Sequence, residues 1–336
     1  MKSFTLCLLV LLAVVPSSAQ NGETWFSTFS IIAYDPVTNE LGVGVQSRAF
    51  GAGAAVPWAE AGVGAIATQA AANRTYGPKA IALLKQGLSP AEVVKRITDE
   101  DPGRDTRQVG VIDAKGRSAV YTGKRVIDRN SDPKDSVHIG AWAGHSTGKN
   151  FSVQGNTLAS EEVVKAMARA YENGKGEMAE RLMDALDAGQ SQGGDVRGMQ
   201  SAGILVVRPI ADPNTTTDHY IDIRVDDAEN PFKELRRVLN VRLSGGVAQR
   251  AAQLAREGKV AEAIAQQKKA VEMNSANEQL HYGLAERYAE AGEYLNALSS
   301  LQTAIRRQPR LKQEAVENPA FQKMREMVEF KRLFGQ

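Results

Sequence analysis

The chain has 336 residues, of which 43% are hydrophobic and 24% are charged, an ordinary composition for a globular protein. This length predicts two domains, or one large domain with an appendage. The formal net charge of +2 gives no electrostatic reason to expect a nucleic acid or an anionic membrane surface as a partner.

The N-terminus has the pattern of an export signal. Lys2 precedes the apolar run FTLCLLVLLAVV, and Pro16 and the small residues of SSA follow it, as a signal peptidase requires. We therefore expect residues 1–19 to be a signal peptide and the mature protein to be periplasmic or secreted. The run is too short to span a membrane. Cys7 lies within it and is the one cysteine of the chain, so we expect neither disulfides nor thiol chemistry in the mature protein.

The next region, up to residue 243, mixes strand and helix patterns. In chain order we expect strands at 28–35, 40–48 and 62–70, helices at 76–87 and 89–101, strands at 108–114, 118–123 and 137–144, helices at 160–174 and 177–189, and strands at 201–209 and 218–227. Ser89 and Pro90 form a good helix start, and Gly174 and Gly189 are expected to end their helices with positive φ. This order suits two packed sheets with helices outside.

The sequence changes character after Ser244-Gly245-Gly246. Residues 241–336 contain 15 Lys+Arg and 11 Asp+Glu, a charge of +4 that leaves −2 for the rest. A repeat is visible at an offset of 34, which relates Leu254, Ala255, Gly258, Ala263, Ile264 and Ala270 to Tyr288, Ala289, Gly292, Ala297, Leu298 and Ala304. The period and pattern resemble tetratricopeptide repeats (TPR). We therefore predict an all-α, TPR-like tail at 247–336 that ends in an amphipathic helix over 318–334, an ordinary pair of helical hairpins being the alternative.

Several kinds of site are not supported by the sequence. The four histidines, at 138, 145, 219 and 281, lack the spacing of metal ligands, and no G-x-S-x-G elbow is present. The glycines of GVGVQSRAFGAG belong to no strand-GxGxxG-helix unit, so we interpret them as positions of close packing and turns. We expect no metal and no cofactor.

Several characteristic segments occur, one after another, between Thr28 and Arg237. They include TFSIIAYDP, ELGVGVQSRAFGAGAAVPWAEAGVGAIATQA, AGHSTG, QGN and ERLMDALDAGQSQGGDVRGMQSAGILVV. Together they resemble one bacterial family, domain of unknown function 1028. The resemblance implies an α+β fold similar to that of the N-terminal nucleophile (Ntn) hydrolases, a four-layer αββα sandwich, here over residues 28–243. It implies no named reaction.

Within that wider superfamily, the opening hairpin is similar to the start of proteasome-type β subunits. Thr28 matches the position of the nucleophile, and QSR (46–48) falls where an acidic residue and an arginine occur. Gln46 and Arg48 should share one face of their strand and fold back toward Thr28. Two departures stand out: Gln46 replaces the acid, and GAAVPWAEAGVG contains no lysine.

The chemistry of such a site starts from the chain end. A threonine hydroxyl needs a base, and the α-amino group of a first residue, with a pKa near about 8, can accept its proton. We expect the turn-like TQAAAN (68–73) to supply donors for the oxyanion. The predicted catalytic residues are Thr28, Arg48 and Asn73, and the predicted substrate-binding residues are Gln46, His145, Asn156, Asp195 and Arg197, the last two spaced for a local ion pair.

Three functions remain open on the sequence. Cleavage after Ala19 leaves residues 20–27 ahead of Thr28, so an amidohydrolase or peptidase acting on a small-molecule or peptide substrate needs a second cut, between Ser27 and Thr28. The alternative is a ligand-binding protein on an Ntn-like scaffold. The third is an interaction module whose tail docks a protein partner or mediates self-association as a homo-oligomer.

Overall fold

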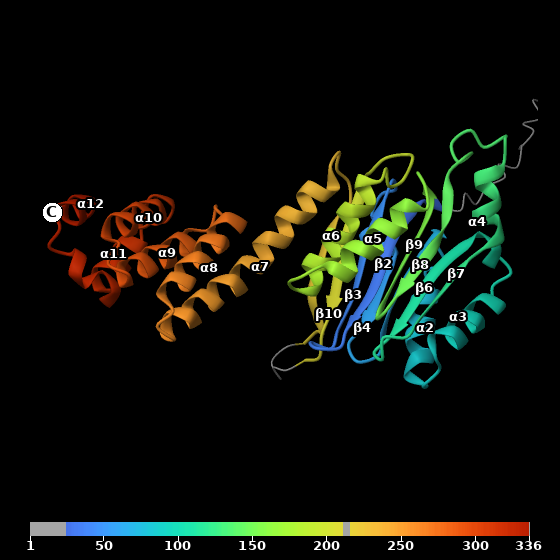
Figure 1. The fold of residues 1–336 in the computed structure, drawn as a ribbon, viewed down its shortest axis with the longest axis horizontal. Helices are drawn as coiled ribbons and strands as arrows, with labels where there is room; N and C mark the ends of the chain where they lie inside the picture. The colour runs from blue at the N-terminus through green and yellow to red at the C-terminus, as the bar shows by residue number, and fades with distance from the viewer. Residues whose placement is uncertain (1–24, 211–215, 336) are drawn as a thin grey trace, which may run out of the picture.

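The computed structural model describes residues 25–210 and 216–335 as two antiparallel sheets followed by a run of helices (Figure 1). The six-stranded sheet has the order β11-β10-β3-β2-β9-β8; the five-stranded sheet has the order β1-β5-β6-β7, with β4 also paired to β5. The strands are β1 (Trp25–Phe26), β2 (Thr28–Asp35), β3 (Glu40–Ser47), β4 (Pro57–Glu60), β5 (Gly64–Ala71), β6 (Arg107–Asp113), β7 (Ser118–Thr122), β8 (Trp142–Gly148), β9 (Phe151–Leu158), β10 (Ser201–Val207) and β11 (His219–Val225).

The helices form one group within the sheet region and a second group after it. They are α1 (Ala52–Ala55), α2 (Tyr76–Lys85), α3 (Pro90–Asp99), α4 (Lys124–Asp128), α5 (Glu162–Asn173), α6 (Met178–Ser191), α7 (Pro231–Arg256), α8 (Val260–Met273), α9 (Glu278–Glu290), α10 (Tyr294–Arg307), α11 (Leu311–Glu317) and α12 (Val328–Phe334), with 3₁₀ turns at Arg104–Thr106, Arg129–Ser131 and Pro319–Met324. In the described part of the chain, no helix is long and apolar enough to cross a membrane.

The two sheets pack face to face, and a pair of helices covers each outer face. One buried cluster joins β2, β9 and β10 to α5 and α6, a second lies between the sheets, and a third joins β5 and β6 to α2 and α3. Along β3, Leu41, Val43 and Val45 face the other sheet. The alternate residues, Gly42 and Gly44, face α6, where a Cβ on Gly42 would lie 2.6 Å from the Met178 sulfur. The glycines of this strand therefore allow close helix packing.

Most of the predicted elements are confirmed, and some details are wrong. Ser89 caps α3 with a capping box, as expected. Strands β1, β4 and β9 and helices α1 and α4 were not predicted, and residues 137–141 precede β8 instead of extending it. Gly174 ends α5 with φ of −63°, and Gly189 lies inside α6, so neither adopts the predicted positive φ. Helix α6 instead ends at Ser191, and the left-handed residues that follow it are Gly193 and Gly194, with φ of 100° and 53°.

Polar side chains fill part of the space between the sheets. We call the group formed by Ser30, Gln69, Gln108, Ser152, Gln154 and Asn156 the inter-sheet polar network; each of its side chains is buried. The Gln69 amide accepts from the Ser30 hydroxyl at 2.7 Å and donates to the Gln108 amide oxygen at 2.8 Å. Gln154 donates to the Ser30 hydroxyl at 2.7 Å, and Gln69 also donates to the Thr28 carbonyl at 3.2 Å. The network therefore connects four strands of two sheets.

The tail helices recur at the predicted spacing. Helices α8 and α10 begin 34 residues apart, at Val260 and Tyr294, and the turns before them contain Gly258 and Gly292 with φ of 76° and 78°. The predicted single terminal helix over 318–334 is wrong, because this stretch divides into a 3₁₀ turn and α12. The tail has its own buried cluster, which extends from Tyr282 to Phe334.

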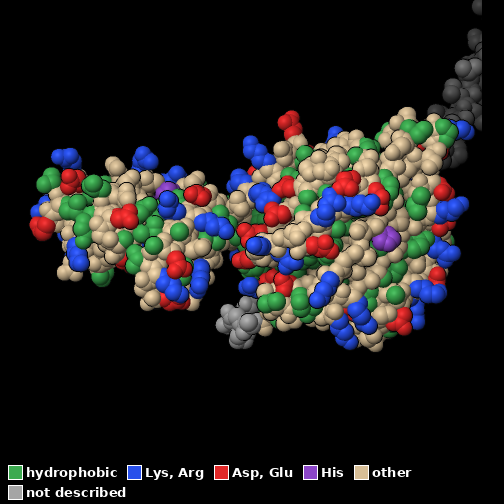
Figure 2. Space-filling model, in the orientation of Figure 1, with side chains coloured by type: hydrophobic (Ala, Val, Ile, Leu, Met, Phe, Trp, Pro, Cys, Tyr) green, Lys and Arg blue, Asp and Glu red, His purple; other side chains and the backbone are tan. Residues whose placement is uncertain are grey.

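Helix α7 joins the sheet region to the tail without a break (Figure 1). Phe232, Leu235, Leu239 and Leu243 belong to the core beneath α5 and α6, whereas the end of α7 pairs with α8. Gly245 and Gly246, which we expected to mark a boundary, lie within the helix and are exposed. Figure 2 shows basic and acidic side chains interspersed on the viewed face of both parts, in keeping with the small net charge.

The inter-sheet polar network predicts a specific loss of stability. Replacing Gln69→Met should lower the free energy of unfolding by about 2–4 kcal/mol, because several buried polar partners lose hydrogen bonds at once. Urea titration followed by tryptophan fluorescence measures the sheet region alone, since the three tryptophans, at 25, 58 and 142, precede the tail. The exposed Gln86→Met is the matched control, and equal effects of the two substitutions would contradict the role of the network.

The two glycines inside α7 predict a gain of stability. Gly245→Ala and Gly246→Ala should each stabilise the helix by about 0.5–1 kcal/mol, since an added Cβ meets no atom within 4 Å and alanine favours the helix. Slower amide hydrogen exchange in the middle of α7 measures this. Gly258→Ala has the same open surroundings but φ of 76°, so it should destabilise the tail.

Candidate functional site

The hairpin of β2 and β3 places Thr28 opposite Ser47. The four-residue connection pairs Asp35 with Glu40, and the antiparallel register runs from there to the pair Thr28–Ser47. Both of these side chains face the other sheet, since Ser47 lies two residues after Val45 and shares its face of β3. Gln46 lies on the opposite face, toward α6. The predicted approach of Gln46 to Thr28 is therefore wrong by one residue, because successive side chains of a strand point to opposite faces.

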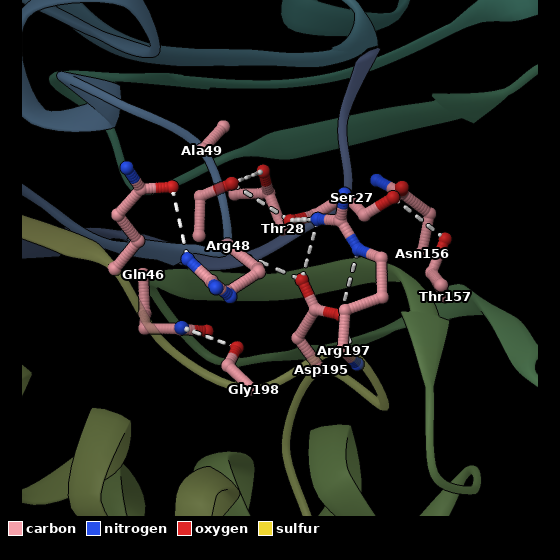
Figure 3. Close-up of polar contacts among 12 residues, drawn as sticks. Ser27, Thr28, Gln46, Arg48, Ala49, Asn156, Thr157, Asp195, Arg197 and Gly198 are labelled. Atoms are coloured by element: carbon pink, nitrogen blue, oxygen red, sulfur yellow. Dashed lines mark hydrogen bonds and ion pairs between the residues drawn. The ribbon is translucent and has the colours of Figure 1, made fainter. Parts of the chain in front are cut away.

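The peptide bond between Ser27 and Thr28 is held by an unusual set of donors (Figure 3). The Thr28 hydroxyl donates to the Ser47 hydroxyl at 3.0 Å, and the Ser47 hydroxyl donates to the Ser27 carbonyl oxygen at 2.7 Å. The Arg197 guanidinium donates to the same carbonyl oxygen at 3.0 Å. The Thr157 hydroxyl donates to the Ser27 hydroxyl at 2.9 Å. Together with Asp195, which orients Arg197, we call these residues the residue-28 cluster.

Asp195 and Arg197 form the ion pair that their spacing predicted. The guanidinium contacts both carboxylate oxygens, at 3.1 Å through Nε and at 2.8 Å through Nη2. The Asp195 side chain is fully buried, and that of Arg197 is 22% exposed. The segment is fixed to β9, because Val196 N–H donates to the Thr157 carbonyl at 3.1 Å. A bidentate, buried pair of this kind orients the guanidinium rigidly.

Gln46 and Arg48 support this segment from β3. The Gln46 amide donates to the Gly198 carbonyl at 3.2 Å, and its own buried oxygen has no hydrogen-bond partner. Arg48 is exposed; its backbone N–H lies 3.4 Å from an Asp195 carboxylate oxygen, and its guanidinium donates to the Gln200 side chain at 3.2 Å. Both residues therefore contact the segment that contains Asp195, and no described hydrogen bond joins either side chain to Thr28.

The chain before Thr28 covers the cluster. Ser27, Thr28 and Ser47 are all 0% exposed. Residues 25 and 26 form β1, an antiparallel strand paired with β5 at Ala71 and Ala70 respectively. The chain thus leaves the five-stranded sheet at residue 26 and enters the six-stranded sheet at residue 28. In the intact chain, no external substrate can reach the Thr28 hydroxyl.

Backbone strain accompanies this crossing. Four non-glycine residues in the described part of the chain have positive φ, and two of them, Asn39 and Asn150, belong to a residue type that tolerates it. The other two are Ala70, at 64°, and Thr157, at 60°. Ala70 pairs with residue 26, and Thr157 donates to Ser27. Strain of this kind, of order 1–3 kcal/mol per residue, concentrates at functional sites.

Asn73 belongs to a different cluster. Its amide donates to the Asp101 carboxylate at 3.1 Å, and Tyr76 and Arg107 donate to the same carboxylate at 2.9 Å and 3.0 Å. The predicted turn over 68–73 is also wrong, because β5 continues to Ala71. The strand continues because β6 pairs with it as far as Ala70. The Asn73 side chain is therefore engaged with Asp101.

His145 and Asn156 occupy two further environments. His145 is exposed on the edge strand β8, and desolvation by its neighbours lowers its pKa. Asn156 is buried, donates to the Gln108 amide oxygen at 3.0 Å and leaves its own oxygen without a hydrogen-bond partner. It is thus part of the inter-sheet polar network. Within the described residues, no group of three or more His, Cys, Asp or Glu is arranged to hold a metal ion.

Sequence reasoning missed Ser27, Ser47 and Thr157. The hairpin itself contained the signal for Ser47, because a four-residue connection that pairs residues 35 and 40 necessarily pairs residues 28 and 47. Thr157 carried no such signal. It meets Ser27 only because β9 lies beside β2, and its positive φ turns the strand at this point.

Comparisons with known proteins agree with this architecture. The profile of a family of unknown function, DUF1028, matches residues 28–235. A crystal structure of a DUF1028 protein from Silicibacter pomeroyi is similar, with a TM-score of 0.55 and 28% sequence identity over 64% of this chain and 86% of that one. A search of the curated proteins finds no significant match.

The Asp101 cluster predicts a dependence of stability on pH. Burial alone would raise the pKa of Asp101, but four hydrogen bonds to its carboxylate lower it to about 2. A lowered folded pKa stabilises the protein above the unfolded value of about 3.9, and this contribution is lost as the pH falls through about 2. Its size is about 2 kcal/mol.

Asp101→Asn should therefore destabilise the sheet region at pH 7 by about 3 kcal/mol, since Arg107 loses its carboxylate counter-charge. The difference from wild type should narrow by about 2 kcal/mol between pH 5 and pH 2, measured by urea titration at each pH. Asp128→Asn, at an exposed carboxylate, is the control and should follow the wild-type profile. A difference that stays constant with pH would contradict the assignment.

Proposed function

Since this chain belongs to the DUF1028 family, which names no reaction, its function has to come from the site, and we propose an exported, Thr28-dependent amidohydrolase of the Ntn type. The proposal includes cleavage of the Ser27–Thr28 bond, so that Thr28 becomes the first residue. The packing of two antiparallel sheets between two pairs of helices is the arrangement that an Ntn-like sandwich requires, and it supports this proposal.

The single observation that carries the proposal is the geometry around the Ser27 carbonyl. Two donors, the Ser47 hydroxyl and the Arg197 guanidinium, point at the oxygen that would gain negative charge when the carbonyl carbon is attacked. The Thr28 hydroxyl is linked to the same oxygen through Ser47. Donors fixed on a developing oxyanion are among the largest contributions to acyl-transfer catalysis. Here the side chains of Ser47 and Arg197 would provide the oxyanion donors that we had expected from residues 68–73.

The proposed cleavage takes two steps, an acyl shift and the hydrolysis of an ester. First, Thr28 Oγ attacks the Ser27 carbonyl carbon, the new O–C bond replaces the C–N bond, and the hydroxyl proton passes to the Thr28 nitrogen. Second, water attacks the resulting ester, which releases the Ser27 carboxylic acid and restores the Thr28 hydroxyl. The free α-amine that results can then accept the hydroxyl proton during attack on another amide. Asp195 would keep Arg197 oriented throughout.

The remaining parts of the proposal concern location and partners. Residues 1–24 lie outside the described residues, so export rests on the signal-like sequence alone. The tail helices, with their spacing of 34 residues, support a TPR-like element that docks one partner or a second copy of the chain. The substrate would be a peptide or a small-molecule amide, without metal or cofactor.

The test is the N-terminus of protein recovered from the exported fraction of its host. We expect wild type to begin at Thr28, and Thr28→Ala to retain Trp25 and to lack amidase activity, because no hydroxyl is available for attack. Thr28→Ser should still be cleaved, and Ser47→Ala should slow cleavage on the order of 100-fold, since one donor to the oxyanion is lost. Intact-mass measurement over time follows each variant.

The control is Thr147→Ala, at an exposed position of β8, which should be cleaved like wild type. Recovery of wild-type protein with residues 25–28 still joined would contradict the proposed amidohydrolase, because Thr28 is fully buried in the intact chain. That result would favour the alternative, a ligand-binding protein whose buried, unpartnered Gln46 and Asn156 oxygens await a donor.

A further inference from the structure

Residues 25–27 show how the acyl side of a substrate would lie. The segment is extended, pairs antiparallel with β5, and ends at the carbonyl that Ser47 and Arg197 hold. Residues 25–27 thus occupy the place of the acyl side of a substrate amide, because they provide the carbonyl of the Ser27–Thr28 bond and Thr28 provides its nitrogen. From this geometry, and resting on the proposed function, we infer that the substrate is an extended peptide with a small residue, preferably serine, on the carbonyl side of the cleaved bond.

The edge of β5 provides the peptide-binding surface. On the side away from β6, strand β4 pairs with β5 only from Gly64 to Ala67, and β1 pairs with Ala70 and Ala71. Departure of β1 would leave the backbone groups of those two alanines as an open edge beside Thr28. An open edge of a sheet binds an extended peptide through main-chain hydrogen bonds, whatever its side chains.

The position of Ser27 limits the residue that carries the reacting carbonyl. Its side chain is fully buried, and its hydroxyl accepts a hydrogen bond from Thr157 at 2.9 Å. Thr157 is held in a strained backbone conformation, and the segment of Asp195 and Arg197 lies against it. A serine, alanine or glycine fits this space, whereas a branched or aromatic side chain would have to displace Thr157 or Arg197.

The substrate classes that the sequence left open would make different use of these two features. An acylated small amine with a short acyl group would use the donors to its carbonyl but would leave the β5 edge empty. A peptide of at least three residues on the acyl side would use both. Two independent features, the strand pairing of residues 25 and 26 and the buried serine at 27, therefore point to peptides.

The experiment uses a chain that begins at Thr28, the mature form under the proposed function, and its fold is first checked by circular dichroism. Binding of the acid acetyl-Trp-Phe-Ser is measured by titration, and protection of the β5 amides by hydrogen exchange. We expect saturable binding with protection at Ala70 and Ala71. Acetyl-Trp-Phe-Leu should bind at least about 10-fold more weakly, and acetyl-Ser should give no protection of β5.

Thr157→Val supplies the matched variant, because valine keeps the branched shape and removes the hydroxyl. Wild type should prefer acetyl-Trp-Phe-Ser over acetyl-Trp-Phe-Ala by about 5-fold, the value of one hydrogen bond, and the variant should show no preference. Equal binding of the serine and leucine peptides, or binding without protection of β5, would overturn the inference.

Turnover is measured separately, with acetyl-Trp-Phe-Ser carrying an aminocoumarin leaving group. Release of the fluorophore with the same preference for serine supports both proposals. Tripeptide binding at β5 without turnover would retain this subsite and reject the hydrolase. Turnover of other amides, with no binding of the tripeptide, would retain the hydrolase and reject the subsite.

Discussion

The inter-sheet polar network is the constraint on which the site depends. Amide groups buried between two sheets are costly unless they form hydrogen bonds. The bonds from Ser30 to Gln69 and from Asn156 to Gln108 therefore hold β2 and β9 in one position relative to β5 and β6. Gln69 also donates a hydrogen bond to the carbonyl of Thr28. The start of β2 is thereby fixed relative to the very strand that pairs with β1, and the chain must cross the space between the sheets within a single residue, Ser27.

That crossing explains the chemistry and the strain together. The Ser27–Thr28 peptide bond lies where the sheets meet, enclosed by Ser47 from β3 and Arg197 from the segment after α6. That segment directly follows α6, so its position depends on where α6 packs. The glycines of β3 let α6 approach the sheet closely. The unfavourable backbone conformations at Ala70 and Thr157 persist because the surrounding sheets determine them. A rigid scaffold thus holds one polarised carbonyl beside one hydroxyl.

The tail is connected to this scaffold through a continuous helix. Four apolar residues in the first half of α7 belong to the sheet-region core, whereas the second half packs with α8. The glycine pair at 245–246 suggested a linker, but these residues keep helical geometry because the helix is anchored at both ends. The helical spacing of 34 residues follows from small residues and turn glycines, which are local properties of the sequence.

The sequence by itself determined most of the strands and helices, the tail spacing, and the Asp195–Arg197 pair, because periodicity, turn glycines and short spacing act locally. It also marked Thr28 as the residue of interest. It missed β9, where buried polar residues interrupt the apolar pattern. Only the tertiary structure decided that Ser47, not Gln46, faces Thr28, that Asn73 bonds Asp101, and that Thr157 meets Ser27. These contacts depend on which strands become neighbours and on the face each residue takes, and a shift of one residue reverses that face.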